Sequence, residues 1–565
     1  MIKKYIPYIL LGLIILLAIV TRFYKLGEIP KGFYVDEAGQ GYSAYSILKT
    51  GKDEFGKSFP IVFRSLTDFK TPVYIYLIVP LIPIFSLTPF TVRLPSFIFS
   101  ILSFPILYFL IKHFLKNERI ALISSLLLAI SPWHILFGRT NFECNVALFF
   151  FLAGILAFYK ALKNPKILIL SALMFAIAIP AYHSQRIITP LMMIILFIRF
   201  RKTLLDKIHK PYLITGVILG LIISLPTLSI AFTPGFWARA NGLNIFSHTH
   251  QMPDGFIYNY SGFLSWIING SWFLSTREFF WHYFSYFSPR YMFNLGDYDI
   301  RMNIPELSTF FLWQFPFYIY GLWLLFKKKN LGELKFFTII TLLINPIPAA
   351  VTRDPYTTIR ALPLVISQII IIAIAIEDIF MRIKGNLLRN LSLLIFLGLI
   401  IYSIFKLYSS IFILNEYYRA KAWNLGWQQV ANDISRLHTT LPIVVDNARS
   451  NPDLTLAFFL KYNPALYQKE NFEVPLSQYY TNLYRNPVKH VGNITVRPIE
   501  WQKDLFVEQY MIGDELGISL QQIQVHKLTL IDQIDYPDGT PAYRIVRTNP
   551  QFAEEQEELF NHESK

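Results

Sequence analysis

The sequence is poor in cysteine and in charge. Its 565 residues include a single cysteine, Cys144, which excludes an intramolecular disulfide framework and a thiolate metal site. Only 16% of the residues are charged, whereas 53% are hydrophobic and the mean hydropathy is +0.40. An average soluble domain has about 25% charged residues. The composition therefore excludes an ordinary water-soluble protein and indicates a membrane protein.

Long apolar runs account for this composition. They recur in blocks of about 16 to 22 residues, close to the ~20 residues that a helix needs to cross the hydrocarbon core. Alternation over about ten residues, the pattern of a membrane β-barrel, does not recur. We therefore expect a mainly α-helical polytopic membrane protein with about eleven transmembrane helices. The expected spans are 5–20, 92–111, 120–136, 143–159, 167–182, 187–198, 211–231, 307–326, 336–350, 361–380 and 391–413.

The basic residues predict the orientation. Lys3 and Lys4 precede the first apolar run, which lacks a small-residue cleavage site and is typical of a retained signal anchor with its N-terminus in the cytoplasm. A further apolar stretch, Pro72 to Leu87, would move every later loop to the other side if it crossed. If it lies in the interface, the large basic clusters fall in the cytoplasm, as the positive-inside rule requires. Because the net charge of +15 sits mostly in these clusters, it does not predict nucleic-acid binding.

This topology predicts two domains. Residues 1–413 form a transmembrane domain with extracytoplasmic loops 22–91 and 232–306. Residues 414–565 form an extracytoplasmic soluble α/β domain. Within it we expect a strand at Leu441–Asp446, a helix at Leu454–Tyr462 and a hairpin formed by 527–536 and 542–547.

Two adjacent acids, Asp36 and Glu37, lie in the first outer loop. Like charges and partial burial raise the pKa of at least one member of such a pair, which suits a general base or a metal ligand. A solvated turn or a helix cap is the alternative. Lys70 and Arg93 bracket the interfacial stretch, where cations either hold a lipid phosphate or anchor the chain to headgroups.

Further polar residues occur where other helices enter the membrane from outside. Arg139, Glu143 and Asn145 are close in sequence, and polar groups at that depth are costly unless paired or used. A structural pair of Arg139 with Glu143 is the alternative reading. Two more loops each end in an arginine, and between them they carry Tyr182, His183, Arg186, Arg353 and Arg360. A lone histidine such as His183 is more often a hydrogen-bonded interface residue than a proton acceptor.

These mouths of five helices face one compartment, which predicts a cleft for an anionic substrate that arrives through the lipid. A transporter or flippase of lipid-linked sugars is the main alternative, although its polar sites would lie nearer the bilayer midplane. A non-catalytic assembly protein is a second alternative, but it leaves the clustered polar groups without a use.

The order of these motifs resembles the GT-C glycosyltransferases, specifically glycosyltransferase family 39, with the protein O-mannosyltransferases and the aminoarabinose transferases of lipid A. The resemblance rests on Asp36-Glu37, Lys70-Thr71-Pro72, Arg93-Leu94-Pro95-Ser96 and the loops 139–145 and 182–186. It covers about the first 200 residues well and the remaining helices loosely. Lys-Thr-Pro replaces the Lys-Pro-Pro common in the aminoarabinose branch, which leaves the sugar and the acceptor open.

The resemblance implies an inverting transferase of the cell envelope. It would move a sugar from a polyprenyl-phosphate donor to a hydroxyl of a lipid, glycan or protein on the outer face of the plasma membrane. Asp36 would be the general base and Glu37 would assist it. Glu143, with His183 and Tyr182, would position the acceptor or supply a second acid. The phosphate would contact Lys70, Arg93 and Arg139, with Arg186, Arg353 and Arg360 as second choices. No cofactor or metal is expected, although a divalent metal stays an open alternative because the branches of this superfamily differ.

Overall fold

The computed structural model describes residues 5–65, 68–115, 117–247 and 271–563. Its contacts divide the chain into two compact units. Unit 1 comprises Met1–Leu26, Thr71–Tyr74 and Leu94–Phe412, and unit 2 comprises Gly27–Lys70, Ile75–Arg93 and Ile413–Lys565. The expected cytoplasmic Lys3 and Lys4, and residues 248–270 of the predicted loop 232–306, lie outside the described residues. Unit 2 thus joins the first predicted outer loop to the C-terminal region.

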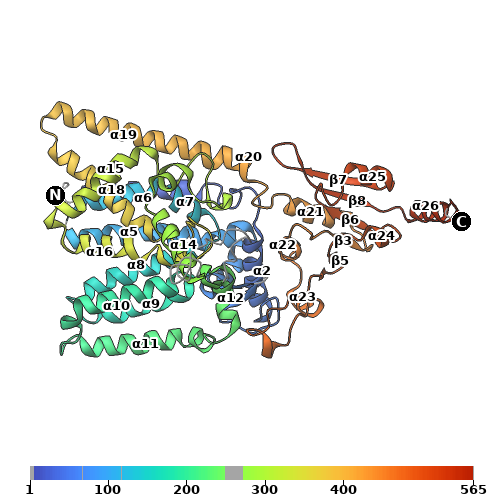
Figure 1. Ribbon diagram of the computed structural model, residues 1–565, viewed down its shortest axis with the longest axis horizontal. Coiled ribbons are helices and arrows are strands. Elements are labelled where there is room, and N and C mark those ends of the chain that lie inside the picture. Colours follow the sequence, from blue (N-terminus) through green and yellow to red (C-terminus); the bar gives the residue numbers. More distant parts are fainter. Residues whose placement is uncertain (1–4, 66–67, 116, 248–270, 564–565) are drawn as a thin grey trace, which may run out of the picture. The chain divides into compact units, whose positions relative to one another are not determined.

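Unit 1 is a helical bundle in which α8, α9, α10, α11 and α16 run side by side (Figure 1). Its principal helices are α1 (Ile6–Phe23), α5 (Pro89–Leu115), α6 (Glu118–Ala129), α7 (Pro132–Arg139), α8 (Cys144–Ala161), α9 (Ile167–Ala181), α10 (Gln185–Leu204), α11 (Lys210–Ser229), α12 (Pro234–Leu243), α14 (Ser271–Ser285), α15 (Phe315–Lys327), α16 (Gly332–Ile344), α17 (Ile347–Ala350), α18 (Leu364–Arg382) and α19 (Asn386–Ser409).

Each predicted apolar block contains a helix, but the number of spans differs from the prediction. Among the described residues, seven helical segments are long and apolar enough to cross a membrane, or eight if the bent pair α6 and α7 counts as one. The helix α9 has 15 residues and α15 has 13, so both are shorter than the usual ~20. The multi-pass helical architecture is confirmed, whereas the count of about eleven is not.

The apolar stretch after Lys70 is a broken helix. It consists of α3 (Pro72–Ile78), a short 3₁₀ turn (Val79–Leu81) and α4 (Ile82–Phe85). Pro80 and Pro83 lack the backbone N–H that a continuous helix uses, which explains the break. The stretch Pro72–Phe85 is shorter than a membrane span. Its predicted place in the interface is compatible with this length and stays a prediction.

The bend between α6 and α7 is held by a buried arginine from α1. The two helices differ in direction by 58° across Ile130 and Ser131, just before Pro132. The guanidinium of Arg22 donates to the carbonyls of Leu128 and Ala129 at the end of α6, at 3.0 and 3.1 Å. Because carbonyls at a helix end lack helical partners, these bonds stabilise the break inside the bundle.

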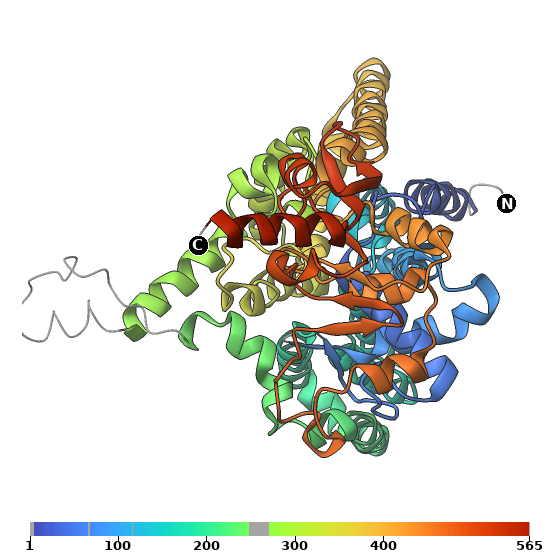
Figure 2. The same cartoon turned by 90° about the vertical axis from the view of Figure 1, so that its right-hand side faces the viewer.

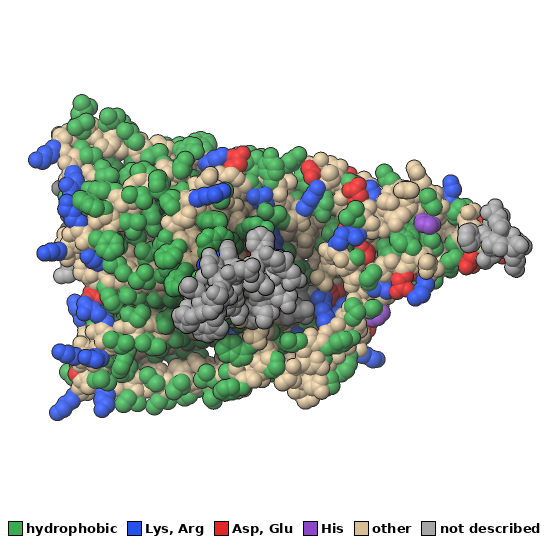
Figure 3. All heavy atoms as spheres, viewed as in Figure 1, with side chains coloured by type: hydrophobic (Ala, Val, Ile, Leu, Met, Phe, Trp, Pro, Cys, Tyr) green, Lys and Arg blue, Asp and Glu red, His purple; other side chains and the backbone are tan. Residues whose placement is uncertain are grey.

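Basic side chains gather at one end of the helical bundle, as Figure 3 shows. In Figure 1, α10 turns into α11 and α18 turns into α19 at that same end. The first of these turns carries Lys202, Lys207 and Lys210, and the second carries Lys384. This sorting of charge is what the predicted topology requires. Which end faces the cytoplasm stays a prediction.

Unit 2 contains a six-stranded mixed sheet, orange to red in Figure 2. Its strand order is β4-β5-β3-β6-β8-β7, with β3 parallel to both β5 and β6 and the other pairs antiparallel. Val444, Met511 and Val546 are buried in its core. The strands are β3 (Ile443–Val445), β4 (Lys489–Val491), β5 (Ile494–Val496), β6 (Tyr510–Gly513), β7 (Thr529–Asp535) and β8 (Pro541–Arg547).

The predicted α/β character of the C-terminal region is confirmed. The predicted strand is β3, the predicted helix is α22 (Asp453–Phe459), and the predicted hairpin is the antiparallel pair β7 and β8. The remaining helices of this region are α20 (Asn415–Arg419), α21 (Trp427–Leu437), α23 (Pro464–Glu470), α24 (Trp501–Asp504), α25 (Leu520–Val525) and α26 (Pro550–Glu563).

The first outer loop folds against this region. Its helix α2 (Val35–Thr50) packs on α22 and α23. Gly41 permits the close approach, since a Cβ there would lie 2.6 Å from the Phe458 ring. The loop then forms a two-stranded hairpin of β1 (Phe63–Ser65) and β2 (Asp68–Lys70). These contacts place the first turn of α2 and the end of β2 in one compact unit.

Candidate active site

The two predicted acids lie in the first turn of α2. The helix begins after Tyr34, whose backbone is extended, and the Tyr34 N–H donates to the Glu37 carboxylate at 3.4 Å. Negative charge is stabilised in a first turn because the unpaired N–H groups there carry partial positive charge. Asp36 and Glu37 therefore begin a helix, as the capping alternative predicted, and they also belong to two ion pairs.

Glu37 forms a buried bidentate pair with Arg93. The Arg93 Nε and Nη2 each donate to a Glu37 carboxylate oxygen at 2.9 Å, and both side chains are almost fully buried. The same guanidinium donates to the carbonyls of Pro30 and Gly32, at 3.3 and 2.9 Å. Such a planar fork fixes both the carboxylate and the loop before α2. Because Arg93 is committed to these acceptors, the arrangement favours a positioning role over contact with a donor phosphate.

The loop that Arg93 contacts needs a glycine. Gly32 has a φ of +96°, which side-chain-bearing residues rarely adopt. A Cβ at this position would lie 2.3 Å from the carbonyl oxygen of Trp423. The turn that precedes the two acids is therefore packed directly on backbone from the C-terminal region.

Asp36 pairs with Lys70 at the end of β2. The Lys70 Nζ lies 3.0 Å from Asp36 Oδ2, and the side chains are 11% and 25% exposed. This exposure distinguishes the pair from Glu37 and Arg93, which are 1% and 0% exposed. Of the four predicted residues in unit 2, Asp36 thus offers the most accessible carboxylate and Lys70 the more accessible cation.

The predicted residues Arg139, Glu143 and Asn145 lie in unit 1 and are buried. Arg139 donates to the carbonyls of Thr21 and Tyr24 at the end of α1, at 3.0 and 2.8 Å. These bonds satisfy helix-end carbonyls. They favour a structural role for Arg139, while its predicted contact with phosphate and the predicted roles of Glu143 stay untested.

The loop between α9 and α10 also belongs to unit 1. Tyr182 is buried, whereas His183 and Arg186 are half-buried. The Arg186 guanidinium lies 4.2 Å from the centre of the Phe236 ring and donates to the Phe236 carbonyl at 3.3 Å. Arg186 thus has an aromatic partner before any ligand arrives.

The remaining predicted arginines lie in the loop before α18. Arg360 donates to Thr352, Asp354 and Thr357, at 2.8 to 3.2 Å, whereas the Arg353 side chain is exposed. Both stay predictions as phosphate contacts. The structure brings Asp36, Glu37, Lys70 and Arg93 together in unit 2. The other predicted site residues lie in unit 1.

One titratable residue of interest was not predicted. Asp297 in unit 1 is buried and accepts hydrogen bonds from the backbone and side chain of Thr358. Burial raises the pKa of Asp297 to about 7, although the hydrogen bonds from Thr358 oppose this shift. No pattern in the sequence marks it, because the two residues lie 61 positions apart. Among the described residues, no group of three or more His, Cys, Asp or Glu side chains could hold a metal ion.

Residues 69–230 match the family described as dolichyl-phosphate-mannose-protein mannosyltransferase. This segment contains Lys70, Arg93, Arg139 and Arg186. The solved structure of ArnT from Cupriavidus metallidurans in the apo state superposes with a TM-score of 0.54 and 10% identity, over 98% of this chain and 99% of that one. The chain has the same fold as ArnT, the GT-C fold.

A second ArnT structure, from the same organism and bound to undecaprenyl phosphate, gives a TM-score of 0.55 at 11% identity. This match covers 96% of this chain and 98% of that one. No curated protein sequence matches the chain. The predicted resemblance to the protein mannosyltransferases and ArnT is therefore confirmed, by sequence over less than a third of the chain and by fold over nearly all of it.

Proposed function

We propose that the protein is an inverting glycosyltransferase. It moves a sugar from a polyprenyl-phosphate donor to an acceptor hydroxyl at the outer face of the plasma membrane. The observation that carries this proposal is the Asp36–Lys70 pair at 3.0 Å, partly exposed and next to the buried pair of Glu37 and Arg93. An inverting displacement needs one base at the acceptor and positive charge at the departing phosphate. The pair supplies both.

The side-chain exposures support the following roles for the two acids. Asp36, at 25% exposed, takes the proton of the acceptor hydroxyl. The acceptor oxygen then attacks the anomeric carbon, and the bond from that carbon to the phosphate oxygen breaks. The electron pair of this bond leaves with the carrier phosphate, whose charge Lys70 stabilises. Glu37, at 1% exposed, cannot reach an acceptor and instead fixes the start of α2 through Arg93.

Binding of the phosphate to Lys70 also explains how Asp36 can act as a base although it is paired with a cation. An ammonium group has several donors and can contact a carboxylate and a phosphate oxygen together. When an anionic phosphate binds, it shares the positive charge that otherwise stabilises the Asp36 carboxylate. Asp36 then becomes a better proton acceptor at the moment when the donor is in place.

An apolar groove in unit 1 supports a lipid-linked donor. It encloses about 460 Å³ between α9, α10 and α11, and apolar side chains such as Phe175, Met193 and Leu221 form almost all of its wall. A hydrocarbon chain is stabilised in such a groove by removal of apolar surface from water or by close packing. One of the two ArnT structures holds undecaprenyl phosphate, which supports the same class of carrier here.

The proposal is tested with membranes that contain the protein and a panel of radiolabelled polyprenyl-phosphate hexoses and pentoses. We expect transfer of label to a lipid, glycan or protein acceptor from at least one donor. NMR of the product should show the opposite anomeric configuration to that of the donor. Retention of configuration would contradict the inverting mechanism. Movement of the donor across sealed vesicles without any transfer would identify a flippase instead.

A further inference from the structure

Lys70 occupies a backbone position fixed by a short hairpin. In β1 and β2, Phe63 pairs with Lys70 and Arg64 pairs with Phe69. Strand pairing leaves little freedom along the strand, because a slip by one residue would turn each side chain to the other face. The position of the Lys70 ammonium beside Asp36 therefore depends on where β1 is held.

Arg64 fastens β1 to the C-terminal region. Its side chain is 2% exposed, and Nε donates to the Glu473 carboxylate at 3.2 Å. The other guanidinium nitrogens donate to the backbone carbonyls of Tyr479, Asn482 and Tyr484. One buried guanidinium thus bonds four acceptors between residues 473 and 484. A lysine would keep the charge but could not reproduce this fork.

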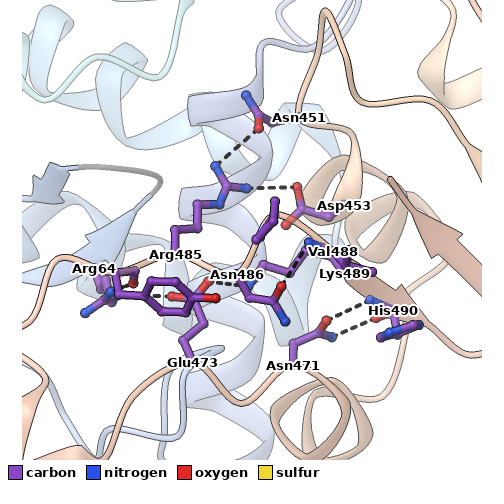
Figure 4. Close-up of polar contacts among 12 residues, drawn as sticks. Arg64, Asn451, Asp453, Asn471, Glu473, Arg485, Asn486, Val488, Lys489 and His490 are labelled. Atoms are coloured by element: carbon purple, nitrogen blue, oxygen red, sulfur yellow. Dashed lines mark hydrogen bonds and ion pairs between the residues drawn. The ribbon is translucent and has the colours of Figure 1, made fainter. Parts of the chain in front are cut away.

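Glu473 lies between two cations. Besides Arg64, it pairs with Lys489 of β4 (Figure 4). Both Lys489 and Glu473 are less than 5% exposed. Loss of the Glu473 charge would leave two buried cations without this counter-charge, which is strongly unfavourable. The carboxylate therefore fixes Arg64 against the sheet of the C-terminal region.

Tyr479, which lies between residues 473 and 484, contacts both strands of the hairpin. The Arg64 backbone N–H donates to the Tyr479 hydroxyl at 2.8 Å, and the Phe69 ring packs edge-on against the Tyr479 ring at 6.0 Å between centres. The Tyr479 hydroxyl itself donates to Asp53, which is fully buried. Phe69 directly precedes Lys70, so this ring contact fixes the residue next to Lys70 in the strand.

We propose that Arg64 and Glu473 are positioning residues for Lys70. Through them, the segment 473–484 of the C-terminal region determines how Lys70 lies against Asp36. The C-terminal region is then part of the donor site rather than a separate module. The proposal rests on the function proposed above, since it concerns how that site binds the donor phosphate.

The first test measures the reactivity of Lys70 without reference to activity. The purified full-length protein is treated in detergent with an amine-acylating reagent, and mass spectrometry follows the rate of Lys70 modification against exposed Lys503. Arg64→Lys and Glu473→Gln should each raise the Lys70 rate at least threefold. The matched control is Arg485→Lys, because Arg485 pairs with Asp453 and Asn451 in the same region and has no contact with the hairpin among the described interactions (Figure 4).

The proposal would be overturned if the rate of Lys70 modification is unchanged in both Arg64→Lys and Glu473→Gln, in protein that elutes as a single species. An equal rise in Arg485→Lys would also overturn it, because the effect would then be general loosening of the region. If Glu473→Gln does not fold, Arg64→Lys alone decides, since it retains the ion pair with Glu473.

The second test separates this proposal from the function itself. If the wild-type protein transfers sugar, Arg64→Lys should raise the donor KM at least fivefold and leave the acceptor KM unchanged. A purely structural defect would lower the amount of active protein at constant donor KM, and this result would contradict a positioning role. Absence of transfer by the wild type would refute the proposed function, while the Lys70 labelling would still decide the position of the hairpin.

Discussion

Single residues of the site differ mainly in their exposure. Asp36 and Glu37 are neighbours with similar chemistry, yet one side chain is 25% exposed and the other 1%. The first turn of α2 directs them to different sides of the helix, because successive residues are about 100° apart. Arg93 holds the inward carboxylate and Lys70 holds the outward one. This division of two acids into a reacting and a structural member is the core of the proposed chemistry.

Lys70 provides a direct test of phosphate binding. We expect Lys70→Met to raise the donor KM about 10- to 100-fold, since one desolvated charge-assisted contact contributes about 1.5 to 3 kcal/mol. The measurement is donor KM and kcat in membranes with matched protein levels. Lys52→Met is the control, because Lys52 is exposed in the same loop. A normal donor KM in Lys70→Met would exclude Lys70 from the phosphate site.

The chemical types of the site residues could be predicted from the sequence, but their pairing could not. Asp36, Lys70 and Arg93 stand out as charged residues near predicted membrane boundaries. The partner of Glu37 lies 56 residues away, and the partner of Arg64 lies 409 residues away. Such pairs depend on tertiary packing, which leaves no local signal. For this reason the pairing of Arg93 with Glu37 was not predicted, and contact of Arg93 with the donor phosphate stays a prediction.

Among the structural elements, α9, α10 and α11 form the groove proposed for the carrier chain. Leu221 of α11 lies in its wall and is 55% exposed, whereas the adjacent Ile222 is 58% exposed and lies outside it. The two positions therefore offer a matched pair for a bulky substitution that disturbs little internal packing.

Leu221→Trp should obstruct the groove. We expect a donor KM at least threefold higher for a long polyprenyl-phosphate sugar, and little change for a donor with a short isoprenoid chain that does not fill the groove. Ile222→Trp should match the wild type with both donors. Kinetics with the two donors provide the measurement. Equal effects of the two substitutions would show that the carrier chain binds elsewhere.

The sequence predicts apolar helices well and their interruptions less well. Length and hydropathy mark α8 and α18 clearly, because a helix in lipid must satisfy its own backbone groups. The bend between α6 and α7 occurs at Ser131-Pro132. This local signal is present in the sequence, but it falls inside the single span predicted for residues 120–136. The shorter α15 begins after a 3₁₀ turn at Leu312–Gln314, where apolar composition continues without helical geometry.

For the whole molecule, the division into units differs from the order of the sequence. The α/β character of the C-terminal region follows from its alternating patterns. Its union with residues 27–70 and 75–93 does not, because that union rests on contacts such as α2 with α22 and Arg64 with Glu473. The proposed site residues Asp36 and Lys70 therefore belong to a loop that folds with the C-terminal region.

The stability of the molecule should depend on pH through Asp297. Its pKa is raised from an ordinary value of 3.8 to about 7 by burial. Because the folded state then binds the proton more tightly, the contribution of Asp297 to stability is greatest below about pH 4 and is lost as the pH rises through about 7. The shift corresponds to about 4 kcal/mol. Asp297→Asn should reduce the difference in thermal unfolding temperature between pH 5 and pH 8, measured in detergent.

Asp535→Asn is the control for this experiment, because Asp535 is exposed on β7. It should leave the difference between pH 5 and pH 8 unchanged. A difference that is the same in Asp297→Asn and in the wild type would contradict the account of Asp297 as a buried, raised acid.

The central claim, that Asp36 is the base of a sugar transfer on this fold, is tested most directly by Asp36→Asn. The substitution preserves size and removes the proton acceptor. The initial rate of transfer from a saturating radiolabelled polyprenyl-phosphate sugar is compared in membranes with equal protein levels, with Asp535→Asn as the control, because Asp535 is exposed on β7. We predict a fall of about 10²- to 10⁴-fold for Asp36→Asn, the usual contribution of a general base. A rate equal to that of the wild type would contradict the account.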